Sequence, residues 1–145
     1  MRHASLRDLN AIYRLFQAHR DVFPHIRQDA LKRRIEAHQC ICQNDVAITF
    51  QKYRKKTRVG EVDIPAGSVM LHQIVNGRQF SGDGGRVFEQ FVAEIVQSSG
   101  GDLYLSVRKA NTVACRFYEK HGMKVVGTVA WKKRTIPGLV YRLRS

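Results

Sequence analysis

Residues 68–91 read SVMLHQIVNGRQFSGDGGRVFEQF and join an apolar stretch to a glycine-rich turn and an amphipathic segment. The apolar stretch Ser68–Val75 predicts a buried β-strand, because short runs rich in apolar and β-branched residues are typical of strands. Val87, Phe88 and Phe91 then recur at the spacing of one helical face, which predicts a helix. The decisive unit is therefore a strand, a glycine turn and a helix.

The glycine turn has the composition of an anion-binding site. The first turn of a helix presents free N–H groups and the positive end of the helix dipole. Glycines at Gly82, Gly84 and Gly85 would let that backbone approach a phosphate closely. No Gly-Lys-Ser/Thr follows, and the G-x-G-x-x-G of a dinucleotide fold is missing. The turn therefore predicts a phosphate or pyrophosphate site of another kind.

The rest of the chain alternates short strands with helices. We predict an α/β (α+β) domain with a mixed sheet of about six to seven strands, flanked by about four helices. The further elements expected are a short strand at Met1–Ser5, a helix capped by Ser5, a helix over Asp29–Ala37, strands at Cys40–Cys42 and Val46–Phe50 joined by the turn Gln43–Asp45, a strand at Leu103–Val107, a helix from Asn111 to Gly122, and strands at Val125–Val129 and Leu139–Leu143 with a turn near Ile136–Gly138.

Length and composition predict one soluble domain over residues 1–145. Hydrophobic residues make up 43% of the chain and charged residues 26%, which is ordinary for a globular protein. No apolar run approaches the ~20 residues that a membrane span needs. The start of the sequence lacks the apolar stretch of a signal peptide, so we expect a cytoplasmic protein without membrane contact.

The three cysteines predict neither a disulfide framework nor a metal site. Cys40 and Cys42 would face one side of a strand, and His38 is the only neighbour of a ligating type. Cys115 falls in a helical pattern, where we expect a buried small apolar residue. We therefore expect no metal.

The charge is unusual. Lysine and arginine number 25 against 12 acidic residues, a formal net charge of +13. A protein of this charge attracts polyanions, so the partner is either an acidic cofactor or a nucleic acid, unless the charge only solvates the surface. Lys52–Arg58, Lys32–Arg34 and Trp131–Arg134 are the densest basic stretches, and Tyr53 and Trp131 could stack on bases.

Two spaced motifs resemble one known family. The first reads Gln79-x-x-Gly82-x-Gly84, and the second reads LSVRKANTVACRFYEKHGM over residues 105–123. In this order they resemble the GNAT superfamily of N-acetyltransferases. The first is similar to its Q/R-x-x-G-x-G/A acyl-CoA motif. The second is similar to its L-x-V-x-x-x-N-x-x-A-x-x-F-Y-E-K-x-G-F stretch, with Met123 in place of the last Phe. The resemblance is strong over Val69–Gly127.

The resemblance implies a GNAT-like, mostly antiparallel twisted sheet and direct acetyl transfer from acetyl-CoA to an amine. In such a protein the strands Met70–Val75 and Leu103–Val107 would diverge to hold the pantetheine arm. Backbone N–H near Ile74 would polarise the thioester carbonyl, and Asn111 would hold the CoA arm or only cap its helix. Tyr118 would protonate the departing thiolate. The implied pyrophosphate loop consists of Gln79, Phe80, Ser81, Gly82, Asp83, Gly84 and Gly85.

Asp83 departs from the family pattern, which more often has a basic or apolar residue there. We expect Asp83 to point outward, with Arg78 and Arg86 supplying positive charge near the phosphates. The general base is open. His72 titrates in the right range, Gln73 lies beside it, and Glu61 and Asp63 lie just upstream.

The acceptor is also open. It is either an ordinary amine or an amino group on a nucleic acid or another acidic molecule. A further alternative is a non-catalytic domain that binds nucleic acid or senses CoA, which an intact Tyr118 disfavours. A homodimer is compatible with the sequence.

Overall fold

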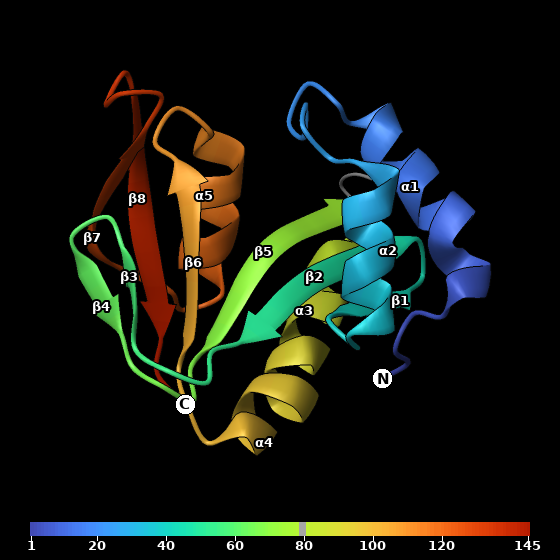
Figure 1. Cartoon of the computed structure of the whole chain (residues 1–145), viewed down its shortest axis with the longest axis horizontal. Coiled ribbons are helices and arrows are strands. Elements are labelled where there is room, and N and C mark those ends of the chain that lie inside the picture. Colours follow the sequence, from blue (N-terminus) through green and yellow to red (C-terminus); the bar gives the residue numbers. More distant parts are fainter. Residues whose placement is uncertain (79–80) are drawn as a thin grey trace. The chain divides into compact units, whose positions relative to one another are not determined.

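The computed structural model describes residues 1–78 and 81–145. Figure 1 shows the chain as a mixture of strands and helices. The elements are a 3-10 turn Leu6–Asp8, α1 (Leu9–Ala18), α2 (Gln28–Glu36), β1 (Cys40–Gln43), β2 (Val46–Lys52), β3 (Thr57–Val59), β4 (Val62–Ile64), β5 (Val69–Asn76), α3 (Asp83–Phe91), a π-helical turn Val92–Val96, α4 (Gln97–Ser99), β6 (Leu103–Arg108), α5 (Thr112–Lys120), β7 (Lys124–Trp131) and β8 (Ile136–Leu143). Gln79 and Phe80, two expected cofactor-binding residues, lie outside the described residues.

The strands form a six-stranded sheet in the order β1-β2-β5-β6-β8-β7 and a separate two-stranded sheet of β3 and β4. The β1–β2, β6–β8 and β7–β8 pairs are antiparallel. β5 and β6 are parallel, with Val69 opposite Leu103 and Met70 opposite Tyr104. The predicted mixed, mostly antiparallel sheet flanked by helices is therefore confirmed.

The chain divides into two compact units. The first consists of Met1–Phe50 with His72–Gln90, and the second of Gln51–Leu71 with Phe91–Ser145. That all 145 residues act as one domain stays a prediction. In the described part of the chain, no helix has the length and apolarity required for a membrane span.

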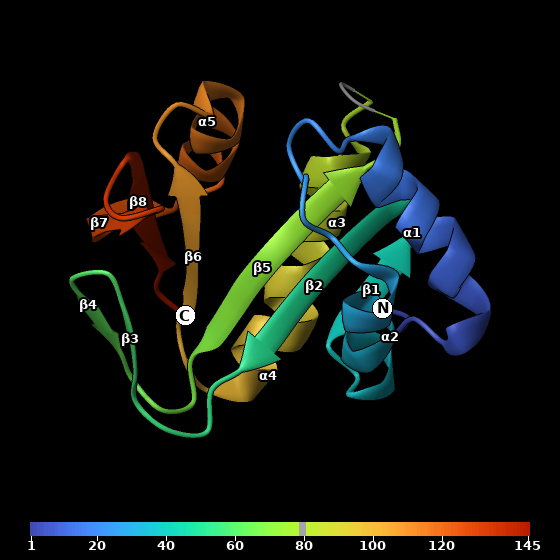
Figure 2. The same cartoon turned by 45° about the horizontal axis from the view of Figure 1, so that its top comes forward.

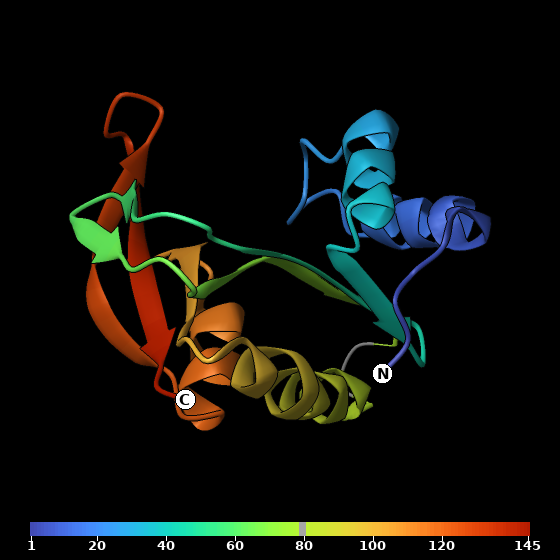
Figure 3. The same ribbon diagram turned by 60° about the horizontal axis from the view of Figure 1, so that its bottom comes forward.

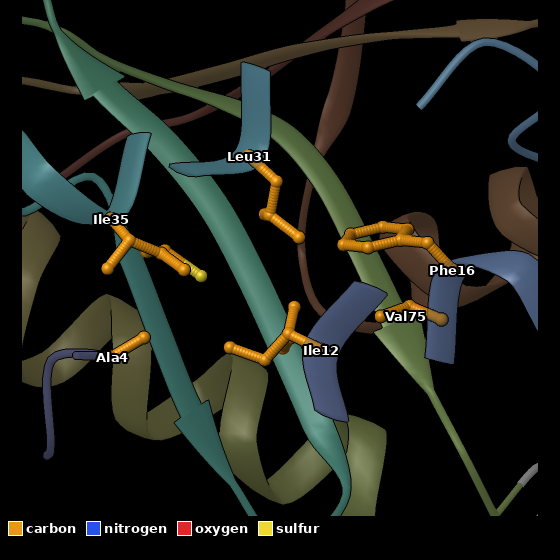
Figure 4. Packing of buried hydrophobic residues seen from close by; sticks show 8 residues of the cluster. Ala4, Ile12, Phe16, Leu31, Ile35 and Val75 are labelled. Atoms are coloured by element: carbon orange, nitrogen blue, oxygen red, sulfur yellow. The ribbon is translucent and has the colours of Figure 1, made fainter. Parts of the chain in front are cut away.

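In the first unit, helices cover both faces of the strands. Figure 2 shows β2 and β5 side by side, and Figure 3 shows α1 and α2 on one face of these strands and α3 on the other. Figure 4 shows the core between the sheet and the first two helices. Phe16 is 1% exposed and meets Phe23 edge-on at 5.1 Å between ring centroids. The core residues are Ala4, Ile12, Phe16, Leu31, Ile35, Cys40, Ala47 and Val75.

The β1–β2 hairpin forms as its sequence predicts. Asn44 and Asp45 adopt φ of 51° and 60°, the left-handed region that a two-residue hairpin turn requires. Asn and Asp tolerate this region better than other non-glycine residues, because their short polar side chains hydrogen-bond locally. The predicted turn at Gln43–Asp45 is confirmed.

In the second unit, β6, β8 and β7 form an antiparallel array with the β3–β4 hairpin beside β7 (Figure 1). The Glu61 N–H donates to the Thr128 carbonyl at 3.1 Å. Gly60 is required at this contact, because a Cβ there would lie 2.2 Å from the same carbonyl oxygen. The buried residues of this core are Ile64, Met70, Tyr104 and Val140. The sequence did not predict the β3–β4 hairpin, because strands of only three residues are too short to show a clear alternation of apolar and polar residues.

The turn expected near Ile136–Gly138 is wrong. The chain turns at Lys132–Arg134, whose φ values are 50°, 54° and 70°, and Pro137 and Gly138 lie within β8. The residue at this strand position is glycine because the Trp131 ring covers it: a Cβ there would lie 2.3 Å from that ring. Proline and glycine therefore mark a close approach here rather than a turn.

Candidate functional site

The glycine turn lies in the first unit, between the end of β5 and the start of α3. Gly82 has φ +84°, a left-handed conformation that favours glycine. Gly84 is buried, and a Cβ on it would lie 3.2 Å from Asn76 Nδ2. The left-handed backbone therefore explains the glycine at position 82, and close packing explains the glycine at position 84. Both features bring bare backbone to a helix N-terminus, as an anion site requires.

Asn76 ends β5 and anchors the start of the turn. Its side-chain oxygen accepts a hydrogen bond from the Arg78 N–H at 2.9 Å. The next residue, Gly77, donates its N–H to the Asp45 carbonyl at 2.8 Å. Arg78 also pairs with the Asp45 carboxylate at 3.3 Å. The β1–β2 turn thus holds the strand end from which the glycine turn departs.

Asp83 does not project into solvent as expected. Its side chain is 16% exposed and pairs with Arg86 one turn along α3. The hydrogen bond from Arg86 is the main reason that the pKa of this carboxyl lies below its usual range. Since Arg78 and Arg86 each have an acidic partner, neither supplies an uncompensated charge. A phosphate at this turn would depend mainly on backbone N–H groups.

His72, the candidate base, lies on β5 in the first unit. Burial, with a smaller contribution from the positive charge of Arg34, lowers the pKa of His72 to about 4. The imidazole is therefore neutral at pH 7 and only weakly basic. The neighbouring Gln73 accepts a hydrogen bond from the buried Thr49 hydroxyl. Ile74 lies on the same strand and is half-buried, and its role at a thioester carbonyl stays a prediction.

The two carboxylates upstream of this strand lie in the second unit. Glu61 follows the β3 strand at the hairpin turn, and Asp63 lies on β4. Asp63 pairs with Arg58 at 3.2 Å. Both carboxylates therefore belong to the β3–β4 hairpin, and Asp63 has an ion-pair partner there.

Asn111 caps α5 in the second unit. Its side-chain oxygen accepts a hydrogen bond from the Ala114 N–H at 3.2 Å, which satisfies a free donor of the first helical turn. This is the capping role considered from the sequence. Contact with a CoA arm stays a prediction. The buried face of α5 consists of Cys115 and Tyr118, whereas Ala114 and Phe117 are half-buried.

Tyr118 is 7% exposed and lies within the second unit near Tyr141, with 6.1 Å between ring centroids. Burial raises the pKa of its hydroxyl well above the ordinary value, and Cys115 adds to the shift. The hydroxyl therefore keeps its proton at neutral pH, as a proton donor must. Cys115 is buried, as expected from its helical position.

A hydrogen bond next to Tyr118 was missed by sequence reasoning. The Tyr141 hydroxyl donates to Glu119 Oε2 at 3.1 Å, and this joins β8 to α5. Tyr141 is 1% exposed. The only signal in the sequence was the position of Glu119 beside Tyr118. Its partner lies 22 residues away, so no local pattern identifies it.

The cysteines and histidines form no metal centre in residues 1–78 and 81–145, where no cluster of three or more His, Cys, Asp or Glu side chains could hold an ion. Cys40 is buried in the first core, and burial raises its pKa to about 12. Cys42 accepts a hydrogen bond from Arg2 at 3.0 Å. Both side chains therefore have packing roles.

No protein-family model matches the sequence. A search of curated proteins also finds no match. Solved structures do match the fold. Ard1 from Thermoplasma volcanium aligns over 99% of this chain and 95% of its own, with TM-score 0.77 and 16% identity. The ribosomal-protein-S18-alanine N-acetyltransferase from Escherichia coli aligns over 99% and 91%, with TM-score 0.71 and 16% identity.

A third match is yncA from Salmonella typhimurium, solved with its cofactor acetyl-CoA. It aligns over 99% of this chain and 91% of its own, with TM-score 0.70 and 17% identity. These structures share an architecture with the present chain at low sequence identity. An acetyltransferase of the GNAT family from Bacillus cereus also aligns over 99% of this chain and 95% of its own, with TM-score 0.74 and 13% identity, so the chain has the fold that GNAT proteins have.

Proposed function

We propose that this chain is an N-acetyltransferase that moves an acetyl group from acetyl-CoA directly to an amine. The observation that carries the proposal is the pair of glycines after β5, the left-handed Gly82 before α3 and the close-packed Gly84 in the first turn of α3, in a chain with the GNAT fold. A glycine turn at a helix N-terminus suits a pyrophosphate. That yncA was solved with acetyl-CoA supports the choice of this ligand.

The residues present fit such a ligand. Gly82 would bend the chain so that backbone N–H groups face the phosphates. The Asp83 N–H, which donates to Ser81 Oγ at 3.2 Å, would have to exchange this partner for a phosphate oxygen. The Asp83–Arg86 pair leaves the turn with little net charge. Binding would therefore come from the backbone and the helix dipole rather than from a cationic side chain.

In this proposal Tyr118 donates its proton to the sulfur of the leaving CoA. The raised pKa of a buried tyrosine makes it a weaker acid. A thiolate leaving into the same apolar surroundings becomes a stronger base for the same reason, as the raised pKa of the buried Cys40 illustrates. The two shifts act in opposite directions on this proton transfer, which is uphill by ~2 kcal/mol for an ordinary tyrosine near ~10 and a thiol near ~8.5.

His72 favours an acceptor amine that needs little deprotonation. An alkylammonium has a pKa near ~10.4, so transfer of its proton to a base of pKa about 4 is uphill by roughly 9 kcal/mol. Loss of a proton to water at pH 7 costs an alkylammonium about 5 kcal/mol but an α-amino group near ~8 only about 1 kcal/mol. An amino group on a nucleobase is already neutral. We therefore propose an acceptor of low basicity, with His72 as a hydrogen-bond acceptor for it.

The test is calorimetry with acetyl-CoA, followed by detection of free CoA thiol with four acceptors. A peptide α-amine and an amino-bearing DNA represent weakly basic amines, and a lysine side chain and a polyamine represent strongly basic ones. We expect acetyl-CoA binding and faster release with the weakly basic pair. Absence of acetyl-CoA binding at millimolar concentration would overturn the proposal.

A further inference from the structure

The end of the second unit formed by β6, β7 and β8 carries a cluster of exposed basic residues. Here it is called the basic tip, and it consists of Arg108, Lys109, Lys132, Lys133 and Arg134. Arg108 lies opposite Gly138 in the β6–β8 ladder, and the Lys109 N–H donates to the Pro137 carbonyl at 3.0 Å. Trp131 lies opposite Ile136 in the β7–β8 ladder. Two segments of the chain, Arg108–Lys109 and Trp131–Gly138, therefore meet at one end of the sheet.

The charges of the basic tip are not compensated. Among the described residues, none of its five side chains has an ion pair. The nearby acid Glu61 lies beside Thr128, three residues before Trp131 on β7. Asp63 is paired with Arg58, and Glu119 accepts the Tyr141 hydroxyl. Other cations of the chain do have carboxylate partners, among them Arg2, Arg27, Arg33, Arg78 and Arg86.

The tip projects as a narrow ribbon. The β6 ladder ends at the Arg108–Gly138 pair, whereas β7 and β8 continue to the Trp131–Ile136 pair. Figure 1 shows the β7–β8 turn extending past the end of β6 within this unit. A two-stranded ribbon of this kind fits the major groove of B-form DNA, which is about 12 Å wide. The major groove of double-stranded RNA is too deep and narrow for side chains to enter.

The backbone of the turn is strained, and its three cations are exposed. Lys132, Lys133 and Arg134 all have positive φ, and none of them is glycine. The Thr135 N–H and hydroxyl both donate to the Lys132 carbonyl, at 3.1 and 2.7 Å, and close the turn. Clusters of strained residues are a mark of functional segments. A turn selected only for chain reversal would use Asn and Gly, as this chain uses Asn44 and Asp45 elsewhere.

We infer that the basic tip docks duplex DNA, with Lys132, Lys133 and Arg134 entering the major groove and Arg108 and Lys109 contacting the adjacent phosphates. This interaction does not depend on acetyl transfer. If the proposed reaction also holds, it would bring an amine of low basicity on DNA to the enzyme.

The experiment measures anisotropy of a fluorescein-labelled 20-base-pair DNA duplex without acetyl-CoA, over a series of salt concentrations. The test variant is Lys132→Gln with Lys133→Gln and Arg134→Gln. The matched control is Arg14→Gln with Arg20→Gln and Lys32→Gln, which removes three exposed cations of the first unit that have no ion pair among the described residues. Both variants lower the formal charge of +13 by three.

We expect the test variant to bind at least about tenfold more weakly at low salt. The log-log salt slope should fall by about 2 when the two phosphate-contacting residues are changed in Arg108→Gln, Lys109→Gln, since each phosphate contact contributes about 0.9. The control should retain affinity and slope. Circular dichroism and acetyl-CoA calorimetry on the same variants separate a folding defect from a loss of docking. An Arg108→Gln, Lys109→Gln variant gives a second measurement that leaves the strained turn intact.

Equal losses in the test and control variants would mean that only net charge attracts DNA, and this would overturn the inference. Equal affinity for duplex RNA and duplex DNA of the same length would overturn it as well. Wild-type affinity for DNA in the test variant as well as in the control variant would also overturn the inference. None of these outcomes bears on acetyl-CoA binding, so the two proposals fail separately.

Discussion

Asn76 and Gly84 are packed against each other at the glycine turn: a Cβ on Gly84 would lie 3.2 Å from Asn76 Nδ2. Asn76 is the last residue of β5, and Gly84 is in the first turn of α3. The contact sets how closely the helix N-terminus approaches the strand end. It therefore links the packing of the first unit to the shape of the proposed phosphate site.

We expect Gly84→Val to weaken acetyl-CoA binding by at least tenfold, or about 1.4 kcal/mol. The added methyl groups displace Asn76 and crowd the backbone that would face the phosphates. Calorimetry measures the affinity, and Ala11→Val on the exposed face of α1 is the control. Adding Asn76→Ala to Gly84→Val should recover folded stability but not affinity. Unchanged affinity in Gly84→Val would remove the glycine turn from the binding site.

Removal of the Tyr118 hydroxyl should act on turnover. We expect Tyr118→Phe to lower kcat by about 100-fold or more, which is the usual range for loss of a general acid. The affinity for acetyl-CoA should change by less than about threefold, because the hydroxyl acts only as the thiolate forms. Steady-state kinetics and calorimetry measure the two quantities. Tyr13→Phe, on a half-buried residue of α1, is the control, and an active Tyr118→Phe would leave only a packing role.

The sequence predicted the elements with strong local patterns. The strand before the glycine turn, the helix after it and the Asn111 cap all have short-range signals, and the structure contains each of them. The β3–β4 hairpin and the turn at Lys132–Arg134 were not predicted. The β3–β4 hairpin depends on a contact between distant residues, Gly60 and Thr128, and the position of the turn depends on the packing of Trp131 over Gly138 across the β7–β8 hairpin.

For the site, the sequence identified residue types but not their electrostatic surroundings. The Asp83–Arg86 pair has the i, i+3 spacing that places side chains together on a helix, a local signal that the prediction did not use. The Arg78–Asp45 pair joins separate parts of the chain and has no local signal. The low pKa of His72 results from burial on β5. The sequence alone gives only the ordinary pKa of a histidine, because it does not show how deeply the side chain is buried. The Tyr141–Glu119 hydrogen bond depends on tertiary packing for the same reason.

His72 should make the protein acid-sensitive above pH 4. Its folded pKa is about 4 and its unfolded value about 6.5, so the neutral form favours folding. This stabilisation is complete above pH 6.5 and is lost as pH falls from 6.5 towards 4, by at most about 3 kcal/mol. Urea unfolding of wild type and His72→Gln at pH 7, 5.5 and 4.5 measures it. The variant should lose less stability over this range.

Two controls identify the source of that acid sensitivity. His25→Gln removes an exposed histidine and should follow the wild type. Asp8, whose pKa the Arg2 hydrogen bond lowers to about 2, destabilises the fold only below its ordinary value of 3.8. Its contribution therefore falls outside the measured range. Identical pH dependence in wild type and His72→Gln would show that His72 is not buried as described.

A glycine substitution in the left-handed turn at the basic tip should not lower folding stability, whereas glycine lowers it at most other positions. Lys133 has φ 54°, which costs a non-glycine residue about 1 to 2 kcal/mol. Lys133→Gly removes that cost and adds unfolded-chain entropy, which offsets about 0.5 to 1 kcal/mol of the gain. Removal of one of three adjacent positive charges adds a small further gain. We therefore expect Lys133→Gly to be as stable as wild type or more stable, by up to about 1 kcal/mol, in thermal unfolding.

The matched change Lys56→Gly, at an exposed lysine that is not among the residues with positive φ, should instead lower stability by about 0.5 to 1 kcal/mol. Equal destabilisation by both changes would mean that Lys133 does not hold the left-handed conformation in solution, and the turn would then lack this backbone strain.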